Sequence, residues 1–178
     1  MIHLARHGQT AYNAEGRFQG HLPVPLDETG REQARALAER VAGVEISALV
    51  CSPRARARET ADIVAARIGL RPQEDPRFAE TDTGEWTGRS FAEIEAEDPD
   101  GFRRFEVSDP TFRYPGGESF AEQSDRVQAG LRDLRARPEK LPALVVCHRG
   151  VIRLALAATT GDHAAGGRAI DNASLVSL

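Results

Sequence analysis

Three short apolar runs constrain the fold of this chain more than any other feature. They occupy residues 2–5, 48–50 and 144–147, and segments with apolar residues at helical spacing lie between and after them. Alternating strands and helices favour a parallel or mostly parallel sheet that helices cover on both faces. We therefore expect an α/β fold, a three-layer sandwich with a mostly parallel central sheet flanked by helices.

Capping signals place the helices. Thr29, Ser52 and Ser119 each stand where an N-cap is expected, the first and last with a Glu three residues later and Ser52 with a proline directly after it. A glycine ends each of the first two helices. A fourth helix is expected over about residues 150–160, whereas residues 9–27 are predicted to form one long loop.

The segment of residues 88–115 differs in amino-acid composition from the rest of the chain. Several acidic residues precede two stretches rich in aromatic residues and arginine, 102–105 and 112–114. One interpretation is a solvated helix face with a loop. The alternative is a lid-like insertion that presents aromatic and arginine side chains to a substrate.

Arg6, His7 and Gly8 come directly after the first apolar run, so a strand delivers them at its tip. A neutral imidazole is a nucleophile with an ordinary pKa near neutral pH, and a guanidinium binds phosphate with a rigid fork of donors. Gly8 lets the backbone turn and lets a ligand approach. The tripeptide alone leaves open a histidine and an arginine that merely face solvent.

Further blocks with matching chemistry follow in order. The carboxyl ends of parallel strands meet at one edge of a sheet, where ligands bind in open α/β folds. Residues that follow the apolar runs are therefore expected to lie together. The later blocks are Ser52–Ala61, Glu80–Gly88 and Leu144–Arg153.

The four blocks resemble the motifs of the histidine phosphatase superfamily, in its phosphoglycerate-mutase-like branch. The resemblance extends from residue 2 to about residue 153, and four ordered motifs are far more specific than Arg-His-Gly alone. It implies a phosphoglycerate-mutase-like arrangement of the sheet. It also implies a last strand within residues 172–178, which is often antiparallel in this family.

The resemblance implies roles for individual residues. His7 would attack phosphorus and become a phosphohistidine, while Arg6, Arg56 and His148 would hold the phosphoryl oxygens. Glu80 would act as the general acid, against the alternative of a solvated surface carboxylate. Positions implied to contact the phosphate or to line the substrate entrance are Asn13, Gln19 and Gly20.

Helix geometry separates the three arginines of the second block. Arg54 and Arg58 are four residues apart and share one helix face, whereas Arg56 points to nearly the opposite side. We expect Arg56 to face the phosphate and the other two to be solvated.

Some positions depart from the family pattern. Arg149 follows the second histidine, where glycine is frequent; either its backbone alone contributes, or its side chain adds a cation for a second anionic group of the substrate. Pro23 stands where mutases carry a hydroxyl. The arginine and tyrosine that follow the acid in cofactor-dependent mutases are missing, as is the long mutase insertion. These differences favour a phosphatase over a mutase.

Composition limits the class of partner. With 178 residues, residues 1–178 are expected to form one domain, and a formal charge of −4 gives no general attraction to nucleic acid or anionic membranes. No apolar stretch reaches the length of a membrane span, so we expect a cytoplasmic protein. No metal or cofactor is expected. A homodimer is kept as an alternative to a monomer.

Cys51 and Cys147 each end an apolar run, and we interpret them as small buried residues rather than as a disulfide. The leading functional hypothesis is a metal-independent phosphomonoesterase that acts on a small phosphorylated metabolite through a phosphohistidine on His7. The alternatives are a phosphoglycerate mutase and a catalytically silent regulatory protein with the same fold.

Overall fold

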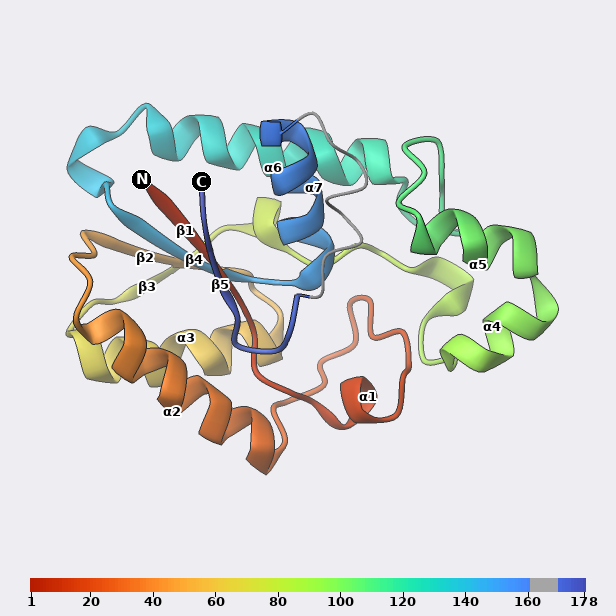
Figure 1. The fold of residues 1–178 in the computed structure, drawn as a ribbon, viewed down its shortest axis with the longest axis horizontal. Coiled ribbons are helices and arrows are strands. Elements are labelled where there is room, and N and C mark those ends of the chain that lie inside the picture. Colours follow the sequence, from red (N-terminus) through yellow and green to blue (C-terminus); the bar gives the residue numbers. More distant parts are fainter. Residues whose placement is uncertain (161–169) are drawn as a thin grey trace.

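The computed structural model describes residues 1–160 and 170–178, and a five-stranded sheet forms its centre (Figure 1). The strand order is β3-β2-β4-β1-β5; the first four strands run parallel, and β5 pairs antiparallel with β1. This confirms the predicted mostly parallel sheet and its antiparallel last strand. The strands are β1 Ile2–Arg6, β2 Ala48–Cys51, β3 Pro72–Glu74, β4 Ala143–Cys147 and β5 Leu175–Ser177.

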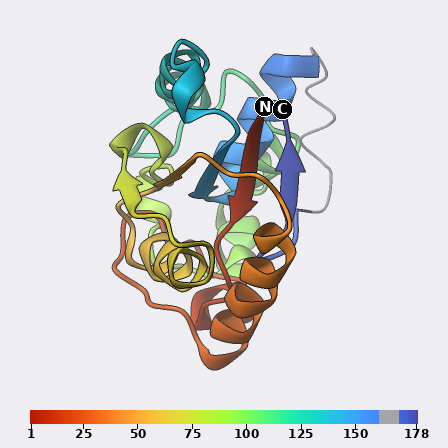
Figure 2. The same ribbon diagram turned by 90° about the vertical axis from the view of Figure 1, so that its left-hand side faces the viewer.

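Four long helices cover the two faces of the sheet, which gives the predicted three layers (Figure 2). One pair of helices packs on each face. The pairs are α2 Glu28–Ala42 with α3 Ala55–Ile68, and α6 Phe120–Arg135 with α7 Arg149–Thr160. Short 3-10 turns lie at Pro76–Phe78, Gly84–Trp86 and Pro138–Lys140.

The central strand β4 shows why the sheet needs cover on both sides. Leu144 and Val146 join the core under α2 and α3, whereas Val145 and Cys147 join the core under α6 and α7. All of them are buried, because alternate residues of a strand point to opposite faces. A continuous apolar run is therefore the pattern that a central parallel strand requires.

Aromatic residues of the segment 88–115 form a third core, while its acidic residues at 93–100 form an exposed helical surface. The segment contains α4 Phe91–Glu97 and α5 Pro99–Glu106, which lie at one end of the molecule, away from the sheet (Figure 1). Buried aromatic rings from this segment pack against Phe18, Trp86 and Phe120. The apolar side chains, rather than the acidic ones, therefore determine how this segment folds.

Two helix starts differ from the prediction. Asp27, not Thr29, caps α2, because its carboxylate accepts the backbone N–H three residues further on at 2.7 Å. Arg54, not Ser52, is the N-cap of α3, and it makes no side-chain cap bond. The Ser52 hydroxyl lies 2.7 Å from Nε2 of His148 and accepts the backbone N–H of Arg54 at 3.2 Å.

Two short elements were not predicted. Residues 9–27 are not a single loop, since they contain the one-turn helix α1, Ala11–Ala14, which begins in a capping box between Thr10 and Asn13. The edge strand β3 has only three residues, one of them proline, and lacks the apolar run on which strand prediction relies.

The structure also shows the state of the two cysteines and whether the described residues contain a membrane-spanning helix or a group of metal ligands. Cys51 and Cys147 are free thiols with fully buried side chains, in agreement with their interpretation as core residues. Among the described residues, no helix has the length and apolar character that crossing a membrane requires. Within the same residues, no three histidine, cysteine or acidic side chains are grouped so that they could hold a metal ion.

Close contact between two backbone segments holds the loop after β1 against α2. A Cβ at Gly30 would collide with the backbone oxygen of Gln9, and a Cβ at Gly8 would collide with that of Gly30. The loop that carries Gly8 directly follows His7. The position of the histidine therefore depends on the missing side chains of these two glycines.

Replacing Gly30 with alanine should lower the free energy of unfolding by about 1–3 kcal/mol, because the methyl group forces backbone segments apart. Alanine otherwise favours a helix over glycine, so the direction is diagnostic. Gly43→Ala, at the end of the same helix with no atom within 4 Å of its added Cβ, is the control and should be neutral or stabilising. Equal urea midpoints for the two variants would contradict the contact.

Candidate active site

The register of the parallel strands brings two histidines together. Arg6 pairs with Cys147 across β1 and β4, so the next residue of each strand, His7 and His148, leaves the sheet at the same level. Their ring centroids are 5.2 Å apart. Both rings are buried, His7 being 1% exposed. Ser52 leaves β2 beside them and completes this edge.

The hydrogen bonds of His7 determine which of its ring nitrogens carries the hydrogen. Nδ1 lies 2.6 Å from the carbonyl oxygen of Gly8, which can only accept, so Nδ1 carries the hydrogen. Nε2 accepts a hydrogen bond from Nε of Arg56 at 3.2 Å. Burial, followed by the charges of Arg56 and Arg6, holds the pKa of His7 well below its ordinary value. His7 is therefore a neutral imidazole with its lone pair on Nε2.

Arg56 is the fully buried cation of the site. Its terminal nitrogens donate to the carbonyl oxygens of Gly20 at 3.1 Å and Leu22 at 3.3 Å, while Nε points to His7. Burial lowers its pKa to about 10, which leaves the guanidinium charged at neutral pH. The structure thus agrees with the direction that helix geometry predicted for Arg56.

Of the two neighbouring arginines, Arg58 lies at the surface, whereas Arg54 has a buried Nε and its charge helps to lower the pKa of His148. Arg58 pairs with Asp62 and Glu74 at the surface, and Arg54 donates to the carbonyl oxygen of His21. Both side chains are only half-buried.

Glu80 and Arg6 lie at the cavity side of the histidines. An oxygen of the Glu80 carboxylate is 3.8 Å from Nδ1 of His148, whose Nε2 contacts Ser52. Burial and the charge of Arg56 hold the pKa of His148 well below its ordinary value, so this contact joins the Glu80 carboxyl group to a neutral ring and is not an ion pair. Burial lowers the pKa of Arg6 to about 10, so Arg6 also stays charged.

Three residues that the sequence analysis did not single out surround the Glu80 carboxyl group. The backbone N–H of Thr81 donates to the carboxylate at 3.0 Å, and the Thr81 hydroxyl donates to Gln123 at 2.6 Å. A Cβ on Gly150 would stand 2.9 Å from the same carboxylate oxygen. The glycine that follows Arg149 therefore leaves room for the acid.

Asn13, Gln19 and Gly20 are among the residues that line the cavity, and their contact with a substrate stays a prediction. The side-chain oxygen of Asn13 accepts hydrogen bonds from the Thr10 backbone and from Asn172, and that of Gln19 accepts from the Thr10 hydroxyl. The amide NH₂ groups of Asn13 and Gln19 are therefore available to donate hydrogen bonds to an anion. Gly20 has a φ of +47°, and its Cβ would collide with the Thr83 hydroxyl.

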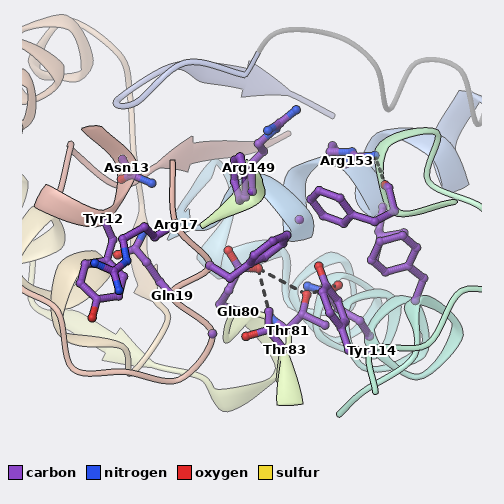
Figure 3. A pocket seen from close by; sticks show the side chains of 18 of the residues that line it. Tyr12, Asn13, Arg17, Gln19, Glu80, Thr81, Thr83, Tyr114, Arg149 and Arg153 are labelled. Atoms are coloured by element: carbon purple, nitrogen blue, oxygen red, sulfur yellow. Dashed lines mark hydrogen bonds between the residues drawn. The ribbon is translucent and has the colours of Figure 1, made fainter. Parts of the chain in front are cut away.

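Arg6, Asn13, Gln19, Gly20 and Glu80 are among the residues that line one cavity of about 300 Å³, which is the size of a small-molecule site (Figure 3). In Figure 3 Glu80 lies below Arg149, with Tyr12, Arg17 and Gln19 to one side and Tyr114 and Arg153 to the other. His7, Arg56 and His148 are buried behind this lining rather than part of it. The lining includes the charged residues Arg6, Arg17, Glu80, Arg149 and Arg153, and the aromatic residues Tyr12, Phe18, Phe91, Phe105, Tyr114 and Phe120.

The segment 88–115 contributes its aromatic residues to this cavity but none of its arginines. Phe91, Phe105 and Tyr114 line the cavity, whereas Arg104 and Arg113 pair with carboxylates at the surface. Closure of the segment over a substrate stays a prediction. Arg153 was missed, although its spacing of four residues from Arg149 on one helix could have indicated it.

Comparison with known proteins gives a family match over nearly the whole chain. Residues 2–178 match the family model described as histidine phosphatase superfamily (branch 1). A probable phosphoglycerate mutase GpmB of Enterobacter sp. (strain 638) is 39% identical over 149 residues, which are 83% of this chain and 69% of that protein. The corresponding protein of Salmonella choleraesuis is 36% identical with the same coverage.

Solved structures of phosphatases are also similar. A mycobacterial glucosyl-3-phosphoglycerate phosphatase complexed with VO3 has a TM-score of 0.88 and 33% identity, covering 98% of this chain and 88% of that one. A putative alpha-ribazole-5'-P phosphatase from Escherichia coli has a TM-score of 0.78 and 32% identity, covering 90% and 79%.

Acidification should destabilise the protein below about pH 6.5, where histidines of the unfolded chain take up protons. His7 and His148 have lowered pKa values in the folded state, so the unfolded state binds more protons and the free energy of unfolding falls with pH. The loss approaches about 1.4 kcal/mol per pH unit for each histidine. Urea unfolding at pH 7.5 and 5.5 measures it, and His7→Gln should roughly halve the difference. Equal stability of the wild-type protein at both pH values would show that the histidines are not held neutral.

Proposed function

This chain belongs to the histidine phosphatase superfamily, and we propose that it hydrolyses a small phosphomonoester through a phosphohistidine on His7. One observation carries the proposal: His7 is neutral, its Nδ1 hydrogen is bound by a backbone carbonyl, and its Nε2 lone pair faces the Arg56 cation. A nucleophile next to a fixed cation suits attack on an anionic phosphoryl group.

In the first step, Nε2 of His7 forms a bond to phosphorus and the bond from phosphorus to the ester oxygen breaks. Glu80 donates its proton to that oxygen, which leaves as an alcohol. Arg6 and Arg56 offset the charge on the phosphoryl oxygens. The unpartnered Nδ1 of His148 offers a further donor when it carries the ring hydrogen.

In the second step, water attacks phosphorus and the bond between phosphorus and His7 breaks. Glu80, now a carboxylate, accepts the proton from water, so inorganic phosphate leaves and the enzyme returns to its first state. The contacts of Glu80 with Thr81 and its distance from His148 support one fixed carboxyl group for both steps.

Mutase activity is the second candidate, because relatives at 36–39% identity are named probable phosphoglycerate mutases. A mutase would pass the phosphoryl group to a phosphoglycerate instead of water. The missing mutase insertion and the phosphatase names of similar structures favour hydrolysis. Addition of phosphoglycerate to the phosphorylated protein separates the two, since only a mutase yields bisphosphoglycerate.

Rapid quenching with a labelled phosphomonoester, in the presence of a chelator, should trap an acid-labile, base-stable phosphoryl group on His7. His7→Asn should fold and lose the adduct together with nearly all turnover. Mass spectrometry of the trapped peptide identifies the residue. An adduct on Ser52, Cys51 or His148 would overturn the assignment, and so would activity that requires added metal.

Glu80→Gln should slow phosphorylation of His7 by alkyl phosphates about 10²–10⁴-fold, because an alkoxide needs a proton to leave. Phosphorylation by p-nitrophenyl phosphate should be largely spared, since nitrophenolate leaves without one. Single-turnover bursts measure this step apart from the later hydrolysis. The same loss with both substrates would make Glu80 a binding or structural residue, with Glu118 and Asp82 as the next candidates for the acid.

A further inference from the structure

Helix α7 places two cations on the cavity beyond the histidines. Arg149 and Arg153 are four residues apart, so they share a helix face about 6 Å apart along the axis. Both line the cavity. Neither pairs with a carboxylate in the described part of the chain, whereas Arg17, on the opposite side, pairs with Glu15.

Burial and hydrogen bonds to the backbone hold the Arg153 side chain in one position beside the cavity. Its side chain is 5% exposed, and one terminal nitrogen donates to the carbonyl oxygen of Glu106 at 3.1 Å and to that of Phe105 at 3.4 Å. The guanidinium also lies 5.9 Å from the centre of the Phe105 ring. Its Nε is buried without a hydrogen-bond partner. An unpartnered buried donor is unfavourable unless a ligand accepts from it.

Two more unpartnered donors line the same cavity. The hydroxyl of Ser108 and the amide nitrogen of Gln123 are buried and bonded to nothing within the described residues. Together with Nε of Arg153, these groups can donate hydrogen bonds to a ligand. Of the three unpartnered atoms, only the Ser108 hydroxyl oxygen can also accept one. This donor-rich set fits an anionic group better than a neutral sugar, whose hydroxyls also need acceptors.

The charge balance of the lining leads to the same class of ligand. Four arginines line the cavity, and Glu80 is the single acidic residue among the described lining residues. In the proposed reaction the phosphoryl group meets Arg6 and the buried Arg56, which leaves the pair on α7 without an anion. The aromatic side chains of the lining suit an apolar or ring-shaped body between the two charged ends.

We propose that the substrate is a phosphomonoester with a second anionic group, such as a carboxylate, and that Arg149 and Arg153 bind this group. The inference rests on the proposed function for the place of the phosphate. It makes Arg153, the last residue of the fourth sequence block, a residue that determines specificity.

Calorimetric binding of two phosphonates tests this subsite without any turnover. The probes are 4-carboxybenzylphosphonate and its neutral analogue 4-carbamoylbenzylphosphonate, which differ in charge at the end remote from phosphorus. Wild-type protein should bind the carboxylate about tenfold more tightly or better, as expected for a charged hydrogen bond. Arg153→Met and Arg149→Met should each bring the ratio of the two Kd values close to one.

Arg104→Met is the matched control, because Arg104 also lies over an aromatic ring of this region but does not line the cavity. It should keep the wild-type ratio. Arg149 is exposed, so Arg149→Met decides the matter if Arg153→Met fails to fold. Equal affinity of the wild-type protein for the two probes, or no binding of either, overturns the proposal, as does a ratio that both variants retain.

Hydrolysis of the corresponding aryl phosphates tests the proposed function separately. Discrimination between the phosphonates without hydrolysis would preserve the anion subsite and reject the phosphatase. Hydrolysis without discrimination would preserve the phosphatase and reject the subsite.

Discussion

The hydrogen bond between Arg56 and His7 is the interaction on which the site depends. It joins two buried side chains, and it requires His7 to be neutral because a charged imidazole has no lone pair to offer Arg56. The guanidinium in turn requires the carbonyl oxygens of Gly20 and Leu22. The loop after β1, helix α3 and His7 are thereby fixed as one unit.

The residues around the histidines could be predicted because strand order and chemistry coincide. His7 and His148 directly follow buried strands that pair in register, so a short apolar run was enough to place each of them. Asp27 and Ser52 show where local patterns fail. Asp27 and Thr29 are both suitable caps for α2, and Asp27 is the one used. Ser52 is a suitable cap for α3, but its hydroxyl contacts His148. Local sequence does not reveal which partner prevails.

The position of Arg153 could be predicted only in part, as sharing a helix face with Arg149. Its position depends on the carbonyl oxygens at the end of α5, and α5 depends on the packing of an aromatic core made from distant parts of the chain. The alternation of acidic and aromatic residues in 88–115 left two interpretations open. Only the three-dimensional arrangement shows that the aromatic residues turn inward and form one wall of the cavity.

The position of β1 in the sheet also affects how the protein folds during its synthesis. This strand at residues 2–6 pairs with β4 at 143–147 and β5 at 175–177, and Asn172 donates to the carbonyl oxygen of His7. Such long-range pairing forms slowly and leaves strand edges open in the meantime. During synthesis, β1 is therefore made before both strands that pair with it, and its two edges stay unpaired until residues 143–147 and 175–177 have left the ribosome.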